Sequence, residues 1–408
     1  MKKTIYRYCL LLAISPCAYS ITLQQAQEAA LASNAKLKSA DSLYEAAEKE
    51  KQANRAALFP KLSVQYEKVK NQGSDSTSAQ QNSMVEVRAD IKNPFSHHAL
   101  QGAQDLEQKD IQLSKEEQRN QILHKTRLAY FKVGLIDLQL NYAKNTLQSR
   151  KKELDIVKRK SEGNLLSSND KERVEREFNK QKQKIDILEL KVAAQYEVIE
   201  QYIQYKVDRN TLETPFPTTF TLPDLPPQQR GVPISAKKIE VEREKGQNLL
   251  YQERMKWTPD FFGSYQKGRR EGELDTEAFL LGFTWNVSAA PYFKQRAISF
   301  RIQSAEFLYA QEVQDQKDLV TKAFQELKET LATLKSQKDI ISSSEKIVKE
   351  SLRQHDLGGI PLRTYQEDFE TWTHDSEREL ELRYQAVEKL AELSLLTEDE
   401  HLFYKGLK

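Results

Sequence analysis

The sequence has 408 residues, with 62 Lys+Arg against 60 Asp+Glu and only two cysteines. This balance lacks the basic excess that nucleic-acid binding requires, so no nucleic-acid partner is expected. Beyond the N-terminus there is no run of about 20 apolar residues, which argues against a membrane-spanning helix.

Residues 1–20 have the order of a secretory signal peptide. Basic residues come first, an apolar run follows, and the small residues that end with Ser20 fit a cleavage site. The alternatives are a buried N-terminal helix and a lipid anchor on Cys17, which is disfavoured because Pro16 stands where a small, flexible residue is needed. Cleavage after Ser20 removes Cys9, Cys17 and three of the 62 basic residues, leaving 59. The mature chain then has no disulfide or thiolate chemistry.

Two blocks, residues 61–92 and 260–288, follow helical segments and change to alternating hydrophobicity. Prolines bracket both blocks, and a polar turn lies inside each. The alternation predicts one β-hairpin per block with a single apolar face. Two isolated hairpins are marginal in water, so we expect them to need strands from other chains. The apolar positions are Leu62, Val64, Tyr66, Val85, Val87, Phe279, Leu281, Phe283 and Trp285, and the polar positions include Glu86, Arg88, Asp90 and Asn286.

The rest of the chain is predicted to be helical and charged. No proline interrupts residues 99–162, which would span roughly 95 Å as one helix. Apolar residues recur at 3-4 spacing, as in Leu128, Phe131 and Leu135. This narrow stripe favours coiled-coil packing over a globular core.

The sequence contains an internal repeat, because residues 162–170 match 357–365 without a gap, at an offset of 195. Each repeat is predicted to run as helix, hairpin, long helix, tight turn and helix, and a duplicated unit of this order is rare. The predicted divisions are a first repeat 21–212 with its tip turn at 163–168, a Pro-rich linker 213–233, a second repeat 234–400 with its tip turn at 358–362, and a C-terminal tail 401–408.

This order resembles the TolC family of outer-membrane efflux proteins, the outer membrane factors, over essentially the whole mature chain. The resemblance implies a mainly α fold in which three chains share a 12-stranded membrane β-barrel and a long coiled-coil α-helical barrel. A closed barrel also leaves no strand edge unpaired in lipid. The stretches that carry the resemblance are Thr22-Leu23-Gln24-Gln25-Ala26, Ala30-Leu31-Ala32-Ser33-Asn34 and Ala56-Ala57-Leu58-Phe59-Pro60-Lys61-Leu62.

The resemblance implies an exit duct in the outer membrane of a Gram-negative bacterium, with a periplasmic helical extension, serving a tripartite efflux pump or a type I secretion system. The expected partners are two further copies in a homotrimer, a periplasmic adaptor (membrane fusion) protein, an inner-membrane transporter and outer-membrane lipid. No cofactor, metal or catalytic residue is expected. Drugs, metals and secreted proteins all stay open as cargo.

The resemblance also implies candidate sites at the two tip turns. These turns are expected to contact the adaptor, with Leu166 and Ile360 exposed, although Gly and Asn there also simply permit a tight turn between antiparallel helices. The adaptor-contacting residues are Gly163, Asn164, Leu165 and Leu166 in the first turn and Gly358, Gly359, Ile360 and Pro361 in the second.

A periplasmic constriction is expected beside the second turn. Family members often carry two acidic residues there, which form rings. Asp368 matches the second position, but Tyr365 stands at the first, so a double acidic ring is in doubt. Glu367 is an alternative acid, although a solvated helix face suits it better. The apolar strand residues given above are expected to face lipid and the polar ones the lumen.

The alternative function is a periplasmic coiled-coil adaptor or scaffold without a pore. An adaptor should have one helical hairpin flanked by compact β domains, whereas two helical hairpins and two β-hairpins are predicted here. An enzyme is disfavoured because the sequence has no glycine-rich phosphate loop. We interpret His97 and His98 as surface residues, because adjacent side chains diverge and no cysteine completes a metal site.

Overall fold

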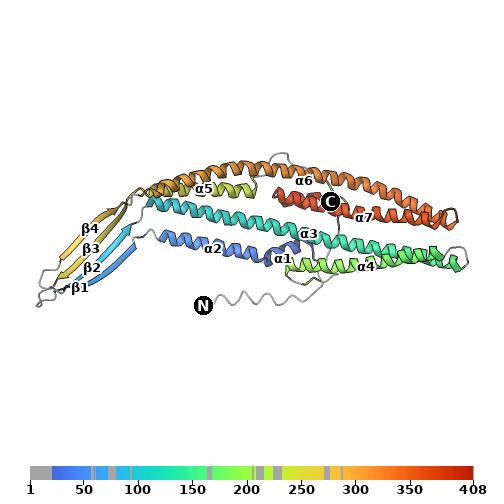
Figure 1. Cartoon of the computed structure of the whole chain (residues 1–408), viewed down its shortest axis with the longest axis horizontal. Coiled ribbons are helices and arrows are strands. Elements are labelled where there is room, and N and C mark those ends of the chain that lie inside the picture. The colour runs from blue at the N-terminus through green and yellow to red at the C-terminus, as the bar shows by residue number, and fades with distance from the viewer. Residues whose placement is uncertain are drawn as a thin grey trace. The chain divides into compact units, whose positions relative to one another are not determined.

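The computed structural model describes the helices and strands of both repeats (Figure 1). The described residues are 21–56, 59, 61–71, 80–91, 94–162, 168–204, 206–207, 216–223, 232–270, 276–285 and 288–407. In chain order the elements are α1 (Leu23–Ser33), α2 (Ala35–Ala56), β1 (Lys61–Asn71), β2 (Gln80–Ile91), α3 (Pro94–Glu162), α4 (Ser168–Ile203), α5 (Ile234–Met255), β3 (Asp260–Arg270), β4 (Thr276–Thr284), α6 (Ala290–Asp356), α7 (Leu362–Leu396) and α8 (Glu400–Gly406). Helix, β-hairpin, long helix and helix follow one another twice, which confirms the predicted internal repeat.

The chain divides into two compact units, which we describe separately. The strand unit consists of Lys36–Glu117 and Val232–Asp315, and the helical unit consists of Met1–Ala35, Gln118–Gly231 and Gln316–Lys408. Each unit combines residues from both repeats, because the long helices α3 and α6 contribute residues to both.

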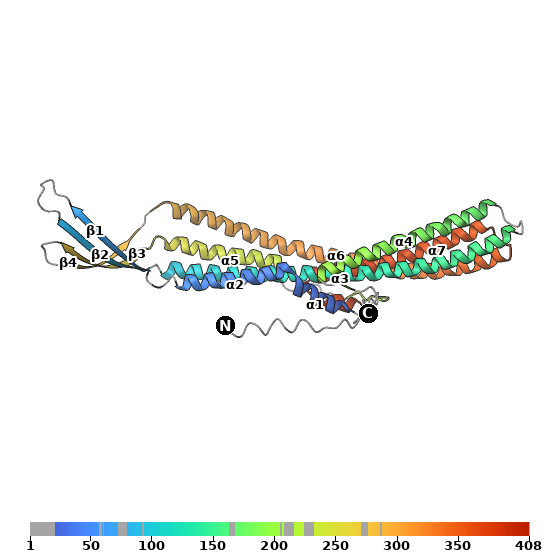
Figure 2. The same ribbon diagram turned by 90° about the horizontal axis from the view of Figure 1, so that it is seen from below.

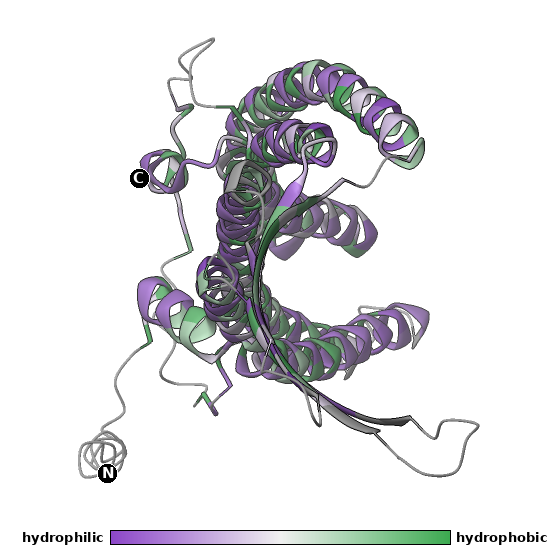
Figure 3. Ribbon diagram, turned by 90° about the vertical axis from the view of Figure 1, so that its left-hand side faces the viewer, coloured by the Kyte–Doolittle hydropathy of each residue, from purple (hydrophilic) through white to green (hydrophobic). Residues whose placement is uncertain are grey.

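The strand unit contains one antiparallel sheet in the order β1-β2-β3-β4. Because β2 pairs with β3, the hairpins of the two repeats join directly, and Val87 lies between Val64 and Tyr265. The sheet follows a curved arc (Figure 3). The expectation that each hairpin needs strands from other chains is therefore corrected in part, since the chain itself supplies the first partner. Within the described residues, β1 and β4 each pair along one edge only.

The helices of the strand unit meet through small and aliphatic side chains. Leu113 of α3 is buried against Ile234 and Val241 of α5. Near this cluster Gly102 of α3 approaches α5 closely, because a Cβ atom at this position would lie 3.0 Å from the Asn248 amide nitrogen. Glycine therefore allows the two helices to pack here without displacing Asn248.

The helical unit has its main core where α3, α6, α7 and α8 meet. In Figure 2, α3, α4, α6 and α7 lie side by side in this unit. Hydrophilic and hydrophobic residues alternate along the helix ribbons in Figure 3, as expected for the 3-4 spacing of apolar residues. The buried core residues are Phe131, Leu135, Phe216, Ala323, Leu327, Tyr384, Val387, Leu390, Ala391, Leu393, Leu402 and Phe403.

Two segments outside the two predicted repeats, the linker and the C-terminal tail, contribute to the helical core. Phe216, from the segment predicted as a linker, is buried in the core, and Phe220 forms an antiparallel bridge to Leu407. The predicted C-terminal tail is instead helix α8, which begins where Asp399 accepts a hydrogen bond from the backbone N–H of His401 at 3.0 Å. Both segments carry aromatic residues. The free energy gained by burying those side chains exceeds the conformational entropy lost when the segments are ordered.

Arg127 of α3 holds α8 in place. Its side chain is 2% exposed, donates to Ser394 Oγ at 3.2 Å and lies 4.8 Å from the centroid of the Phe403 ring. Burial lowers the pKa of Arg127, and the neighbouring Tyr404 and Glu400 oppose this shift. A guanidinium retains its charge even so, and its contact with the Phe403 ring partly compensates for the water it loses.

We expect Phe403→Ala to destabilise the protein by about 3–5 kcal/mol, because Phe403 is fully buried and its loss leaves a cavity. Tyr404→Phe is the matched comparison, since it removes only the hydroxyl that donates to Gln27 at 2.8 Å and should cost about 1 kcal/mol. Urea unfolding followed by helical circular dichroism measures both. Equal losses in the two variants would show that α8 does not depend on this packing.

Candidate functional site

The sheet has one continuous apolar face. Alternate residues of a strand share a face, and the antiparallel register aligns the apolar ones across all four strands. Leu62 is 66% exposed, Phe279 71% and Leu281 76%, so this face lacks a cover within the described chain. A patch of this kind needs lipid or protein against it. One row across the four strands consists of Val64, Val87, Tyr265 and Phe279, and Tyr66 and Val85 lie in the row next to it. The other row consists of Leu62, Ala89, Gly263 and Leu281, and Phe261 and Phe283 lie in the row on its far side.

The opposite face of the sheet carries polar side chains. Arg88 pairs with Asp90 at 2.8 Å, and its guanidinium lies 4.3 Å from the centroid of the Phe262 ring. That ring lies over Gly282, where an added Cβ atom would approach it to 2.5 Å. Glu86 shares this face. The predicted separation of apolar and polar residues is therefore present in most of the register, although Lys267 and Glu277 pair at 2.8 Å in the row of Tyr66 and Leu280 lies on the polar face. Contact with lipid or a lumen stays a prediction.

Trp285 follows the last residue of β4 instead of lying within the strand. Its side chain is 58% exposed, and its Nε1 donates to the carbonyl oxygen of Trp257 at 2.9 Å. An exposed indole whose polar atom is satisfied suits a boundary between an apolar layer and water. The predicted lumen residue Asn286 lies outside the described residues.

A second exposed apolar surface runs along α6 in the strand unit. Phe293, Phe300 and Phe307 recur every seven residues and are 66%, 64% and 70% exposed. Ala297 and Ser304 lie between them at 3-4 spacing and are also exposed. This is the pattern of a coiled-coil seam with large and small side chains in alternation. We call these five residues the phenylalanine seam; sequence analysis missed them because their spacing is shared by many core stripes.

The second tip turn joins α6 to α7. Gly358 has a φ of +76°, which favours glycine, and the backbone N–H of Gly359 donates to the Gln354 carbonyl at 2.8 Å. Ile360, expected to be exposed, is half-buried against the core of this end, whereas Leu357 is 77% exposed. The predicted contacts Gly163, Asn164, Leu165 and Leu166 lie outside the described residues.

Behind the second turn, α3, α4, α6 and α7 form a small aromatic core. Tyr365 is 5% exposed there, stacks on His355 with ring centroids 6.1 Å apart and touches Phe369. Burial raises the pKa of Tyr365 to about 12, and the charge of Glu153 adds to this effect, so the hydroxyl stays protonated. The position of Tyr365 differs from the expected one, because its side chain packs between helices and does not lie on an open surface. The other buried members of this core are Leu154, Val157, Val174, Val348 and Leu362.

A buried polar network connects α3 to α7 beside this core. Arg150 and Glu153 pair at 3.0 Å with side chains 6% exposed each, and Gln366 Nε2 donates to Glu153 at 2.9 Å. Arg150 also lies 3.7 Å from Glu370 and 4.5 Å from the centroid of the Phe369 ring. The sequence carries no signal for this network, because Arg150 and Glu153 resemble the many solvated i,i+3 pairs of these helices.

Asp368, the predicted constriction acid, links α6 to α7. Its half-buried carboxylate accepts a hydrogen bond from Ser351 Oγ. Glu367 is exposed and pairs with Arg363 at 2.8 Å, as expected for a solvated helix face. Asp368 therefore has a position suited to both fixing α7 and meeting solvent, which Glu367 and Tyr365 do not share.

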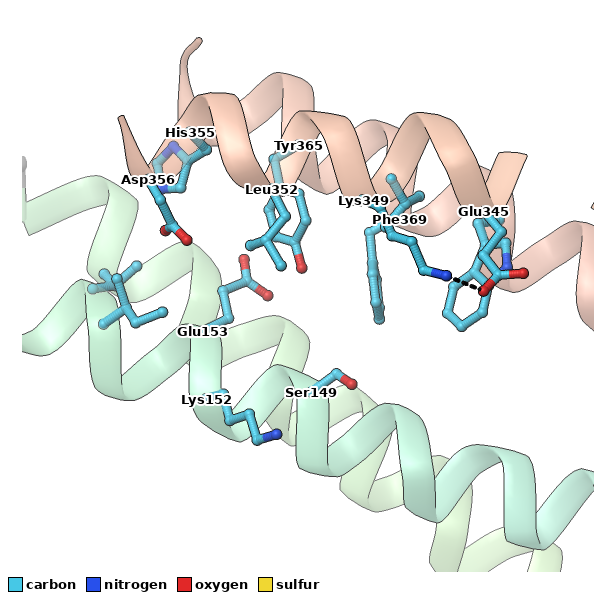
Figure 4. Close-up of a pocket in the computed structure, with 14 residues that line it drawn as sticks. Ser149, Lys152, Glu153, Glu345, Lys349, Leu352, His355, Asp356, Tyr365 and Phe369 are labelled. Carbon is cyan, nitrogen blue, oxygen red and sulfur yellow. Dashed lines mark ion pairs between the residues drawn. The ribbon is translucent and has the colours of Figure 1, made fainter. Parts of the chain in front are cut away.

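A cavity of about 360 Å³ opens between α3 and the α6–α7 pair beside the network (Figure 4). Tyr365, Phe369 and Trp372 of α7 form its aromatic wall. Glu153 points toward the Tyr365 hydroxyl across the gap (Figure 4). Sequence analysis did not predict this cavity, since it depends on how helices of the two repeats are spaced.

Among the described residues, no helix has an apolar stretch long enough to cross a membrane. His98 is exposed, as expected, and the side chain of His97 lies outside the described part of the chain.

The comparisons with known proteins find the fold but no sequence relative. No protein-family model matches the chain, and no curated protein matches it in sequence. A membrane protein from Pseudomonas aeruginosa shares 12% identity with a TM-score of 0.80 over 94% of each chain. The open state of the MtrE outer membrane channel from Neisseria gonorrhoeae shares 14% at 0.78, over 93% of this chain and 89% of that one. The outer membrane protein VceC from Vibrio cholerae shares 13% at 0.76, over 95% and 97%. The chain therefore has the fold of these outer-membrane channels, which confirms the predicted TolC-like fold of long helices and paired β-hairpins, while the closed barrel of three chains stays a prediction.

Proposed function

We propose that this chain, having the fold of the outer-membrane channels, is one subunit of a trimeric exit duct in the outer membrane of a Gram-negative bacterium, serving an efflux pump. The observation that carries this proposal is the four-stranded sheet, which exposes a continuous apolar face and leaves β1 and β4 unpaired along one edge within the described residues. Three such sheets joined edge to edge would make a closed barrel, which lipid requires.

The faces of the sheet support this role. The apolar face suits lipid, with Trp285 at its boundary, and the face of Arg88, Asp90 and Glu86 suits a water-filled lumen. Reconstitution in a planar lipid bilayer tests the proposal: the purified protein should conduct ions as a trimer. An absence of conductance from a well-folded trimer would contradict it. A type I secretion system would use the same duct, and only the cargo would differ.

The phenylalanine seam supports a homotrimer. Apolar side chains at heptad spacing normally bury against another helix, and within the described residues this face of α6 has no such cover. A neighbouring copy is the partner that also completes the sheet edges. One assembly then accounts for both exposed surfaces.

The second tip turn is the proposed contact for the periplasmic adaptor, which would connect the duct to an inner-membrane transporter. The turn presents Leu357 beside Gly358, with Ile360 partly inserted into the core. Asp368, by the same proposal, borders the narrowest part of the duct and holds α7 through Ser351. Tyr365 would stabilise this end from inside the helix cluster.

We expect Leu357→Asp to abolish adaptor contact without unfolding the tip, because the exposed leucine has few contacts to lose and an unpaired carboxylate opposes apolar docking. Ile360→Asp is the comparison, since it places a charge against the core and should lower the thermal midpoint. Photo-cross-linking from the neighbouring exposed position 354 in cells, with and without overproduced adaptor, measures the contact in the parent and in each variant. A Leu357→Asp protein that still cross-links to the adaptor would remove this residue from the docking surface.

A further inference from the structure

The cavity beside Tyr365 has walls suited to an apolar ligand. Its volume of about 360 Å³ falls within the range of small-molecule sites. Val157, Val348 and Phe369 are buried side chains that line it, and Leu352 and Trp372 complete the wall. The wall comes from α3, α6 and α7, so a ligand here would touch both repeats.

A buried hydrogen-bond acceptor borders this cavity. His355 is 7% exposed, and its Nδ1 lies 3.3 Å from the Ile360 carbonyl oxygen. A carbonyl oxygen only accepts, so Nδ1 carries a proton in this contact, and in the uncharged form of the ring Nε2 is then an acceptor. Within the described part of the chain, this Nε2 is buried without a hydrogen-bond partner. In that form of the ring, the buried Nε2 needs a donor from a ligand.

Carboxylates lie beside this acceptor. Glu153 points toward Tyr365, and Asp356 extends from the end of α6 at the cavity edge (Figure 4). The charges of both carboxylates add to the effect of burial that raises the pKa of Tyr365. Of the two lysines that line the cavity, Lys349 is paired with Glu345 at 2.7 Å, and Lys152 points away from Glu153 (Figure 4).

We propose that this cavity binds an organic ammonium ion with an apolar or aromatic body. Its N–H groups supply donors for His355 Nε2 and for the carboxylate of Asp356, and its body contacts Phe369 and Trp372. Glu153 is already satisfied by Arg150 and Gln366, so it offers the ligand no free acceptor. The negative charge of the carboxylates repels an anionic ligand. An uncharged ligand donates weaker hydrogen bonds to these acceptors than an ammonium group does. The site lies within one chain, so binding of a ligand there is independent of whether the assembled protein conducts ions.

Isothermal titration calorimetry of the detergent-solubilised full chain tests this with three matched probes: phenethylammonium, phenethyl alcohol and phenylacetate. Phenethylammonium should bind saturably and more tightly than the other two. Asp356→Asn should weaken it about three- to fivefold, as expected for an exposed charge pair. Leu352→Lys, which places a cation at the cavity edge, should abolish saturable binding.

Glu350→Gln is the matched control, because Glu350 is on the same helix and pairs with the exposed Arg353 at 2.8 Å away from the cavity lining. It should bind phenethylammonium as the parent does. Equal binding of all three probes, or equal effects of Asp356→Asn and Glu350→Gln, would overturn the proposal. Bilayer conductance is measured separately, so failure here leaves the proposed duct untouched.

Discussion

Replacing Phe300 and Phe307 together with glutamate should convert the protein from a trimer to a monomer in detergent. Both side chains lie on the phenylalanine seam and are more than half exposed in the single chain, so little intrachain packing is lost. If each phenylalanine is buried by a neighbouring copy, its removal forfeits about 1.5–3 kcal/mol per site. Each glutamate would also have to be buried without a partner, or keep the helices apart.

Native mass spectrometry and analytical ultracentrifugation measure the oligomeric state of this variant. Phe300→Leu with Phe307→Leu is the matched control, because leucine keeps an apolar seam and should preserve the trimer. Circular dichroism of the glutamate variant should show unchanged helix content. A glutamate variant that remains fully trimeric would show that α6 does not form the interface.

The second large effect is expected from Arg150→Ala, which should raise single-channel conductance and favour long open states. Arg150 satisfies the buried Glu153 and contacts Glu370 and Phe369, so it joins α3 to α7. Removing one partner from a buried pair typically costs about 3–5 kcal/mol, because the remaining charge is left unpaired. Separation of α7 from α3 would let water reach Glu153, and in the proposed duct this widens the constriction beside Asp368.

Planar bilayer recordings compare the parent with Arg150→Ala and with Arg353→Ala. Arg353 belongs to an exposed pair with Glu350, and pairs of this kind contribute only about 0–1 kcal/mol. The Arg353 variant should therefore conduct like the parent. If both variants matched the parent while remaining folded, the α3–α7 network would not hold the duct closed.

Local sequence patterns were enough to predict the repeat and most of its elements. Period-two alternation from Leu62 to Tyr66 and from Phe279 to Phe283 marks strands, because side-chain direction in a strand depends only on parity. Prolines and glycines mark where helices end, because proline lacks a backbone N–H and has a fixed φ, and glycine tolerates a positive φ. Both effects depend on a single residue and can be read from the sequence. The apolar face of the sheet follows from the same parity once strands pair.

The second tip turn shows a feature that local sequence patterns do not predict, namely which of its aliphatic residues is exposed. Leu357 and Ile360 are both aliphatic residues of one short turn, and only the folded turn shows that Ile360 packs inward and Leu357 outward. Tyr365 and Asp368 likewise share one helical face by spacing, yet one packs into an aromatic core and the other reaches Ser351.

The sequence by itself therefore determined the helices, the alternation of the strands and the duplication, because these depend on periodicity and on the backbone chemistry of single residues, and the resemblance to the TolC family then implied the fold class. Only the tertiary structure decided that β2 pairs with β3, that Phe216 and α8 enter the core, and that Arg150, Glu153 and Gln366 meet. Those contacts join residues far apart in the chain. Their formation depends on the shape and spacing of several helices at once, which no local pattern encodes.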